Sequence, residues 1–487
     1  MTAEEGADTV VAHQTAHQAG PDVDVVVAGG GMAGLTAAAT AASHGATVLL
    51  AEAGEKPGGA AWWSNGLFWT ARDLQTYRRH IPDGNPVIAE RIIAGMDDAL
   101  EQIRALGVPI SAHRTDPVMA IGAGHAIDIR ALIQEQEARL RRHGGRIVTG
   151  ARVTGAALRE GAVDVRISSG GSEQRVRSWA LVLATGGHPS SWPASSDLAD
   201  QPVPGVARRC LLHSRGDGLR AGRELGADTA GPPEGVYGHL VPAPLAEDWT
   251  PASFVRLSQY YSDAAVALDL RGRRFADETL GDEVLNQALL DHTETARASG
   301  DADAGTTTPP LAVLLFDDRV RRSRATEESY PGLGPLDRFA AAVDAGGANL
   351  TAEDVPGLVY GLAALGVDTG TARTTVERYR EAIASRSGIA DGVPVTAEAD
   401  PLTEAPFHAL LVQPSVTMTF HGVRTDERFR VLDRGGRPVP GVFAAGADAG
   451  GLQGRRYAGG LAPSFIGGRT AGLEAARLAA SAQGTRR

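Results

Sequence analysis

The chain of 487 residues has little cysteine, no long hydrophobic run and no excess of positive charge. Cys210 is its single cysteine, which excludes internal disulfides and paired-cysteine redox or zinc sites. No window approaches the roughly 18 uninterrupted apolar residues that a membrane span requires, so no span is expected. The formal net charge is −11 and no basic tract is present, which argues against a nucleic-acid partner.

The first 21 residues also lack the features of a targeting segment. They include Glu4, Glu5 and Asp8 and have neither a basic start nor an apolar centre, so we expect a flexible tail and no signal peptide. Together with the single cysteine, this favours a reducing, cytoplasmic location. The hydrophobic content of 43% and the length predict a globular protein with a large core and two domains.

Glycine, in contrast, is abundant, and one glycine cluster follows a short apolar run at residues 25–28. Gly29, Gly31 and Gly34 satisfy G-x-G-x-x-G, in which the glycines serve a tight turn, a close approach to a diphosphate and close packing of helix on strand. A second apolar run ends in Glu52, an acid placed to bind a ribose diol. The pattern predicts a bound dinucleotide, FAD or NAD, and the alternative is a βαβ unit without a ligand.

Further glycine-rich turns follow other predicted strands. Residues 53–66 form a loop whose backbone could reach a cofactor, and a buried strand ends in the small-residue turn at 184–187. Near the other end of the chain, a strand at 439–446 leads through more glycines into a helix at 463–480. We therefore expect both ends of the chain to enclose one long ligand.

Apolar periodicity and turn residues predict the remaining elements. Helices are expected at 32–43, 87–106 and 128–143, and a loop enters a short helix at 215–227 with Asp217 as its N-cap. Short strands at 146–149, 152–158 and 163–168 suggest a meander.

With these motifs in place, the chain resembles the flavoprotein subunits of fumarate reductase and succinate dehydrogenase. The wider family includes 3-ketosteroid dehydrogenases, urocanate reductases and tricarballylate dehydrogenases. Four stretches carry the resemblance: 25–34 with Glu52, 58–64, 184–187, and 406–460 with its Ala444-Ala445-Gly446 turn. The resemblance implies FAD as cofactor, held by the first and last segments beneath a capping domain. The positions that we assign to FAD binding are Gly29, Gly31, Met32, Ala33, Gly34, Glu52, Gly58, Gly59, Ala60, Ala61, Ser64, Asn65, Gly66, Val153, Ala184, Thr185, Gly186, Asp217, Gly446, Ala447, Asp448, Gly460, Ala462 and Pro463.

Departures from the family pattern lie at the substrate end. Thr417 and Met418 stand where fumarate reductases have a histidine pair that holds a substrate carboxylate, and Tyr457 stands where they have a carboxylate-binding arginine. Arg455 and Arg456 are nearby but out of register, so a simple C4 dicarboxylate is not the expected substrate. In ketosteroid dehydrogenases a tyrosine at the position of Tyr457 polarises a ketone, and a phenol suits developing enolate charge.

The proton path of the family is also incomplete. Glu278 matches its glutamate, Gly281 replaces the arginine three residues on, and Arg321 is nearest to the catalytic arginine. Tyr457, Arg321 and Glu278 are therefore the catalytic candidates, although Glu278 could instead pair with Arg273 or Arg274. The substrate candidates are His239, Met418, His421 and Arg456.

The fold class that we expect is α/β, a Rossmann-like FAD-binding domain of the glutathione-reductase type with an inserted α+β capping domain. Its expected parts are a tail at 1–21, FAD-binding segments at 22–234 and 402–487, and a capping domain at 235–401.

The expected function is oxidation or reduction of a C–C bond next to a carbonyl, with a small carbonyl or enone substrate and an unidentified electron donor or acceptor. Two alternatives remain: an FAD oxidase or monooxygenase of a tailoring pathway, and a flavin-binding scaffold without catalysis. The single cysteine excludes a disulfide reductase, and no metal ligands are assigned.

Overall fold

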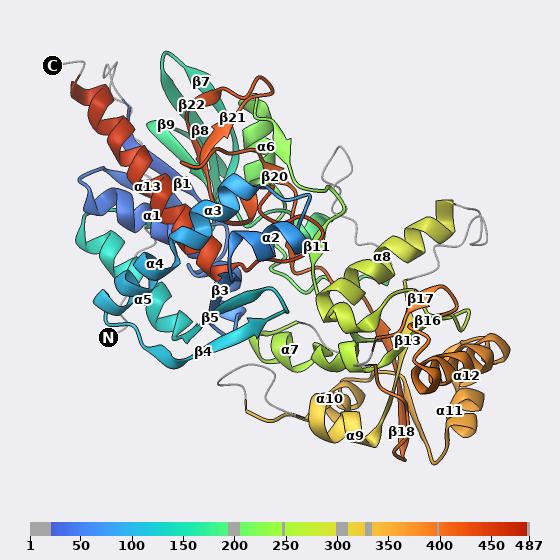
Figure 1. Cartoon of the computed structure of the whole chain (residues 1–487). Coiled ribbons are helices and arrows are strands. Elements are labelled where there is room, and N and C mark those ends of the chain that lie inside the picture. Colours follow the sequence, from blue (N-terminus) through green and yellow to red (C-terminus); the bar gives the residue numbers. More distant parts are fainter. Residues whose placement is uncertain are drawn as a thin grey trace, which may run out of the picture.

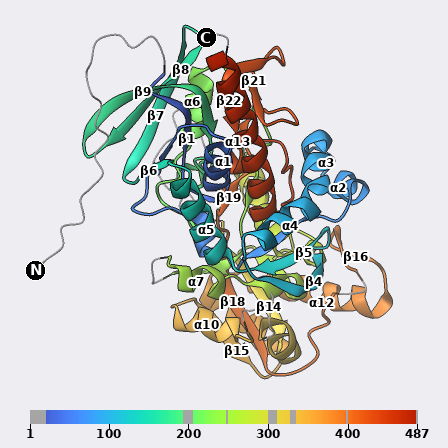
Figure 2. The same cartoon turned by 90° about the vertical axis from the view of Figure 1, so that its left-hand side faces the viewer.

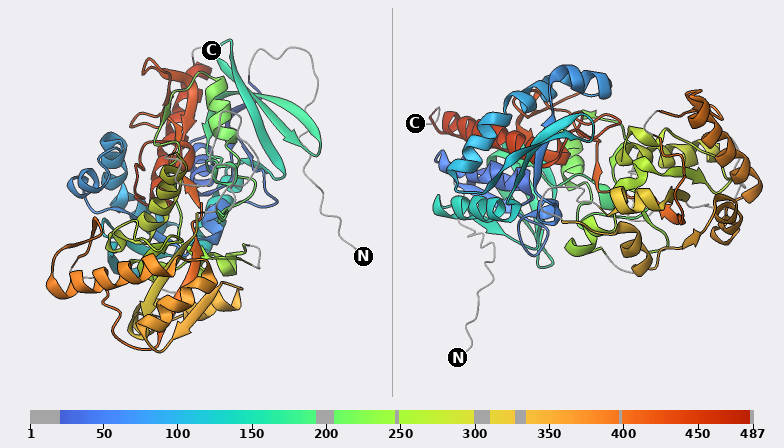
Figure 3. Two further views of the ribbon diagram at one scale, coloured as in Figure 1. Left: turned by 90° about the vertical axis from the view of Figure 1, so that its right-hand side faces the viewer. Right: turned by 60° about the horizontal axis from the view of Figure 1, so that its bottom comes forward.

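Two bodies are visible in the computed structural model, one built on an eight-stranded sheet and one on a five-stranded sheet (Figure 1). The structure describes residues 21–192, 205–245, 249–298, 310–326, 334–396 and 399–484. The expected tail lies outside these residues except for residue 21. Figure 3 shows the two bodies side by side from further directions, with the first and last segments of the chain in the same body.

The large sheet is parallel around its centre and has the order β21-β22-β9-β1-β2-β6, with β7 and β8 attached through β9. β1 runs parallel to β2 and β9, and β22 runs parallel to β9. Helices α1 and α13 cover one face of β1, and strands β7 and β8 with α6 cover the other, so β1 is apolar and buried along nearly its whole length. The strands are β1 (Val23–Ala28), β2 (Val48–Ala51), β6 (Arg146–Val148), β7 (Ala151–Arg159), β8 (Ala162–Ser169), β9 (Ser172–Leu183), β21 (Arg430–Leu432) and β22 (Pro438–Ala444).

Two helices from opposite ends of the chain pack in direct backbone contact. They are α1 (Met32–Ser43) and α13 (Leu461–Gly484), which lie side by side in Figures 1 and 2. A β-carbon on Gly468 or Gly472 would lie 2.3 Å from the carbonyl oxygen of Ala33 or Ala37, respectively. Gly468 and Gly472 follow one another along α13 in the same order as their partners Ala33 and Ala37 along α1, so the two helices run in the same direction. Their N-terminal ends therefore lie on one side.

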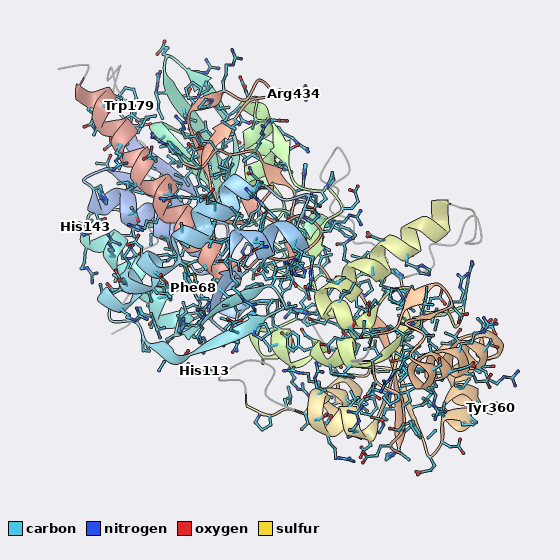
Figure 4. All side chains as sticks on the ribbon, viewed as in Figure 1. Phe68, His113, His143, Trp179, Tyr360 and Arg434 are labelled. Carbon is cyan, nitrogen blue, oxygen red and sulfur yellow. The ribbon has the colours of Figure 1, made fainter. Side chains whose placement is uncertain are left out.

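The remaining helices of this body frame that side. The helix predicted at 87–106 is interrupted at Gly95, which separates α3 from α4, whereas the helix predicted at 128–143 is confirmed as α5. A small sheet of β3, β5 and β4 lies below α13, and the buried ring of Phe68 meets that of Phe465 at 5.9 Å (Figure 4). The bounds are β3 (Leu67–Ala71), α2 (Leu74–His80), α3 (Pro86–Ala94), α4 (Met96–Ala105), β4 (Ile110–Val118), β5 (Gly122–Ile127), α5 (Ile129–Arg142) and α6 (Asp217–Glu224).

The second body is antiparallel. Its sheet has the order β12-β18-β14-β13, with β15 also on β18. The strand β18 includes residues that the sequence placed in the final FAD-binding segment, so the boundary expected at 401 falls before a strand of this sheet. Its elements are β12 (Val241–Pro242), α7 (Pro251–Arg256), β13 (Val266–Asp269), α8 (Asp282–Ala298), β14 (Ala312–Asp317), α9 (Asp318–Val320), α10 (Arg338–Asp344), β15 (Asn349–Ala352), α11 (Val355–Gly361), α12 (Thr369–Ser385), β16 (Ile389–Ala390), β17 (Val393–Pro394) and β18 (Phe407–Gln413).

Two short antiparallel ribbons connect the bodies. β10 (Thr229–Ala230) pairs with β20 (Gly422–Val423), and β11 (Val236–Tyr237) pairs with β19 (Met418–Thr419). In the second ribbon Tyr237 lies directly opposite Met418. No helix in the described part of the chain is long and apolar enough to cross a membrane.

The helix contact predicts a position-specific effect of one methyl group. Gly472→Ala places a β-carbon against the backbone of α1, so we expect a loss of about 1–3 kcal/mol in the free energy of unfolding. Gly484→Ala on the same helix is the matched control, because its β-carbon meets no atom within 4 Å. Denaturant unfolding of the two variants checks this, and equal stability would contradict the close packing.

Candidate active site

The three motif glycines differ in what surrounds them. A β-carbon on Gly29, whose φ is +97°, would lie 2.3 Å from the carbonyl oxygen of Ala184. One on Gly34 would lie 1.9 Å from the carbonyl oxygen of Gly29, whereas one on Gly31 would meet no atom within 4 Å. The first and third glycines therefore serve close packing. The second faces the open space that a diphosphate requires.

The start of α1 is suited to an anion. Gly31 is its N-cap and forms no side-chain capping bond, and no acidic residue lies in the first turn. The first backbone N–H groups and the positive end of the helix dipole are thus available to a phosphate. Beside them, Glu52 is 4% exposed and accepts hydrogen bonds from the amides of Gly30 and Gly54, both at 2.6 Å.

Two adjoining cavities form one elongated site past this helix end. They share the lining residues Gly31, Ala60, Ala184, Gly186 and Thr417. The inner cavity adds Gly29, Glu52, Gly59, Val153, Thr185 and Asp217. The outer cavity adds Met32, Ala33, Ala61, Ser64, Asn65, Gly446, Ala447 and Gly460, and Pro463 lines a small recess beside it. Most positions assigned to FAD therefore border one continuous space, and its residues fit an extended dinucleotide.

Five of the assigned positions lie behind the lining. Gly34, Gly58, Gly66 and Ala462 belong to the supporting backbone. Asp448 is 1% exposed and fixes the turn after β9: it accepts hydrogen bonds from the amides of Thr185 and Gly187, the latter at 3.0 Å. Burial raises the pKa of Asp448 to about 6.

Asp217 is the first residue of α6, with Gly216 as N-cap, and pairs with Arg152 and Arg220.

Aromatic side chains form the substrate end of the outer cavity. Tyr457 and Tyr237 stack with ring centroids 3.8 Å apart and an interplanar angle of 10°, and Trp69 meets Tyr457 edge-on. The Tyr457 hydroxyl lies beside Gly460, where a β-carbon would be 2.4 Å from it. It has no hydrogen-bond partner among the residues that the structure describes. Burial raises the pKa of Tyr457 above its usual range, so the phenol is a proton donor at neutral pH.

Two catalytic candidates, Glu278 and Arg321, do not line this cavity, and their catalytic role stays a prediction. Glu278 is buried in an ion pair with Arg274, at 2.9 Å between Oε1 and Nε, and it also accepts from the amide of Ala267. Arg321 pairs with Asp337 at 2.9 Å. Neither lines the cavity, because each is fully engaged within the second body.

Of the four substrate candidates, only Met418 lines the outer cavity. His421 bonds through Nδ1 to the carbonyl oxygen of Gly231 at 2.9 Å, and Arg456 pairs with Glu283 at 3.0 Å. His239 is fully buried behind Tyr237 and does not itself border the cavity. None of these three residues lines the outer cavity, and their contact with a substrate stays a prediction.

Tyr237 and Arg209 are among the lining residues that the sequence analysis missed. Arg209 is 1% exposed, donates to the carbonyl oxygen of Phe254 and to the hydroxyl of Thr417, and lies 3.5 Å above the Phe254 ring. Within the described ranges no carboxylate forms an ion pair with it. Its flanking sequence, Arg208-Arg209-Cys210, matches no motif, and only its contact with Thr417 reveals its place.

Comparisons with known proteins agree with this geometry. A family model described as an FAD binding domain matches residues 24–88 and 115–462. The fumarate reductase (cytochrome) of Shewanella frigidimarina is 26% identical over 492 residues, covering 93% of this chain and 77% of the relative. The 4-oxocyclohexanecarboxylate 2-dehydrogenase of Sinomonas cyclohexanicum is 27% identical over 570 residues, covering 94% and 95%.

A solved structure of 3-ketosteroid Δ1-dehydrogenase from Sterolibacterium denitrificans shares the fold, with a TM-score of 0.69 at 17% identity, covering 94% of this chain and 99% of that one. The fold and the site define an FAD-dependent flavoprotein oxidoreductase. The chain belongs to the FAD-binding domain family that includes the fumarate reductase flavoproteins, and FAD is its cofactor.

The open space at Gly31 predicts a variant that separates binding from folding. Gly31→Ala directs a methyl group toward the diphosphate position, so we expect FAD affinity to fall at least about tenfold, which corresponds to about 1.4 kcal/mol. The thermal midpoint of the FAD-free protein should stay unchanged, because that methyl group touches no protein atom. Flavin titration and thermal unfolding check both statements, and unchanged affinity would contradict this placement of the cofactor.

Proposed function

We propose that the protein oxidises or reduces the C–C bond next to a ketone, in a substrate that also carries a carboxylate. The observation that carries the proposal is the Tyr457 hydroxyl, a protonated donor in the cavity wall with no hydrogen-bond partner among the described residues. The dehydrogenase relative from Sinomonas cyclohexanicum is named for an oxo acid of this kind, which supports the substrate class.

Tyr457 would act on the carbonyl oxygen. FAD supplies a two-electron centre that exchanges hydride with the substrate when bound. A hydrogen bond from the phenol strengthens as negative charge develops on that oxygen, so it stabilises an enolate more than the ketone. Its stacking on Tyr237 and the small Gly460 hold the hydroxyl in place.

Arg209 would bind the carboxylate. A buried guanidinium without a carboxylate partner is unfavourable, and an anionic group of the substrate would compensate it. Arg209 also contacts Thr417, which stands where the family resemblance implies carboxylate binding. The proposal therefore replaces the missing clamp arginine with an arginine from another segment.

The second body would serve as the cap. α7 and the turn at Tyr260–Ala264 contribute Phe254, Val255 and Tyr260 to the outer cavity. We take the cap to run from residue 235 through β18, between FAD-binding segments that begin at 22 and end at 487.

Tyr457→Phe tests the carbonyl donor. Removing one oxyanion donor lowers kcat by about 10²–10³-fold, so we expect that loss with FAD content unchanged. Turnover is measured anaerobically with 4-oxocyclohexanecarboxylate and an artificial electron acceptor. Tyr360→Phe is the matched control, since Tyr360 is 82% exposed at the outer end of the second body (Figure 4). Equal turnover of Tyr457→Phe and Tyr360→Phe would contradict the role of Tyr457 as hydrogen-bond donor to the carbonyl. Hydroxylated product in air would favour a monooxygenase.

Arg209→Gln tests the carboxylate. We expect KM for 4-oxocyclohexanecarboxylate to rise about tenfold or more, the loss of one charge-assisted contact. The KM for cyclohexanone, which lacks the carboxylate, should change little. Arg209→Lys keeps the positive charge but lacks the planar guanidinium, so its KM for 4-oxocyclohexanecarboxylate should lie between those of the native protein and Arg209→Gln. Equal effects on both ketones would remove Arg209 from substrate binding.

A further inference from the structure

A chain of three hydrogen-bonded side chains leads from the cavity into the protein interior. The Tyr237 hydroxyl lies 2.7 Å from Nε2 of His239, and Nδ1 of His239 bonds directly to Oδ2 of Asp282. His239 is fully buried and Asp282 is 7% exposed. Only Tyr237 borders the cavity, so the chain has one end at the substrate and the other in the core.

Two separate elements bring the three residues together. Tyr237 ends β11, which pairs with β19, and the next residue but one is His239. Asp282 is the first residue of α8, which packs against β11 where the two bodies meet (Figure 1). The amide of His239 donates to Ser415 Oγ at 3.0 Å, and Asn286 on α8 accepts from the amide of Ser415 at 2.8 Å. These two hydrogen bonds fix the backbone of His239 and of Ser415 beside the three linked side chains.

Several charged and titratable groups face this chain. Arg209 and Arg338 act on both His239 and Asp282, and Tyr260 meets the His239 ring edge-on at 4.7 Å. Glu283, paired with Arg456, acts on His239 from α8. Asp263, which pairs with Arg324, belongs to the Tyr260–Ala264 turn.

We propose that Tyr237 exchanges the proton at the carbon next to the substrate carbonyl, and that His239 and Asp282 are positioning residues that take up and return a proton through its hydroxyl. This rests on the proposed function. Tyr237 is the catalytic residue of the set, because it alone can touch the substrate. It occupies the role that the sequence analysis gave to Glu278 and Arg321.

The step balances as follows. In the dehydrogenation direction the phenol oxygen of Tyr237 forms an O–H bond with the proton of the α-carbon, while its own proton passes to Nε2 of His239. The electron pair of the broken C–H bond moves toward the carbonyl oxygen, where Tyr457 donates a hydrogen bond. The Nδ1 proton of His239 remains shared with Asp282, whose carboxylate would offset the cost that burial and the nearby Arg209 and Arg338 place on the imidazolium.

Burial sets the pH at which this chain changes state. It raises the pKa of Asp282 to about 7 and lowers that of His239 well below its usual range. Above pH 7 the carboxylate accepts from Nδ1 and leaves Nε2 free to take the Tyr237 proton. Below it, protonated Asp282 donates to Nδ1 and Nε2 carries hydrogen. Proton removal should therefore increase as pH rises through about 7, and proton return should decrease.

The test measures proton exchange without net redox. Oxidised holoenzyme is mixed with 4-oxocyclohexanecarboxylate in D₂O without an electron acceptor, and NMR follows deuterium at the carbon next to the ketone. The native protein should catalyse exchange with a rate that rises through about pH 7. Tyr237→Phe should lower the rate by at least about 10²-fold, the usual size of a general-base contribution. Tyr360→Phe should leave it unchanged.

The positioning residues have a separate readout. Asp282→Asn and His239→Gln should retain FAD, measured by absorbance, and should lose the pH dependence near 7 as well as part of the rate. A shifted rate with the same pH profile would show a structural role and overturn the relay. Full exchange in Tyr237→Phe would overturn the proposal while the proposed function stands. A native protein that neither exchanges nor oxidises any ketone or oxo acid would overturn the proposed function itself.

Discussion

The site depends on backbone contacts that only glycine permits. Gly34 lies against the carbonyl oxygen of Gly29, and Gly468 and Gly472 lie against those of Ala33 and Ala37. These contacts bring β1, α1 and α13 together although the first and last lie more than four hundred residues apart in sequence. Because α1 and α13 run in the same direction, both helix starts meet the same cavity, and their free N–H groups favour negative charge there.

The two ends of the cavity are built differently. The inner end consists largely of backbone and small side chains from one body, which suits a cofactor of fixed shape. The outer end takes large side chains from both bodies, such as Trp69 from β3 and Phe254 from α7. Such a wall can change by single substitutions without disturbing the glycine contacts. The family shares a fold and a cofactor, while the names of the relatives differ in substrate.

The parts predicted from the sequence were those governed by local spacing. The extents of α1 and α5 follow from residues close together in the chain and were confirmed. The motif glycines and Glu52 lie where the pattern placed them, at the start of α1, and their binding of FAD stays a prediction. Glu278 and Arg321 were matched to the family by position, and the alternative given for Glu278, an ion pair with Arg274, is the arrangement that the structure shows. Glu278 lies four residues from Arg274, and Arg321 finds Asp337 in the next segment.

Tyr237 and Arg209 were missed for a related physical reason. Tyr237 is linked through His239 to Asp282, which lies on a helix 45 residues further along the sequence. Arg209 contacts Thr417, which lies on another segment. No spacing rule connects such residues, because contacts between segments far apart in the chain bring them together.

In the proposed function the two stacked tyrosines take opposite roles. The Tyr457 hydroxyl has no hydrogen-bond partner among the described residues and burial raises its pKa, so it would keep its proton and donate. The Tyr237 hydroxyl is bonded to a buried imidazole that can accept its proton, and the carboxyl of Asp282 behind it stabilises the resulting cation. The two rings lie 3.8 Å apart in the wall of one cavity, so both residues border the space in which the substrate would lie.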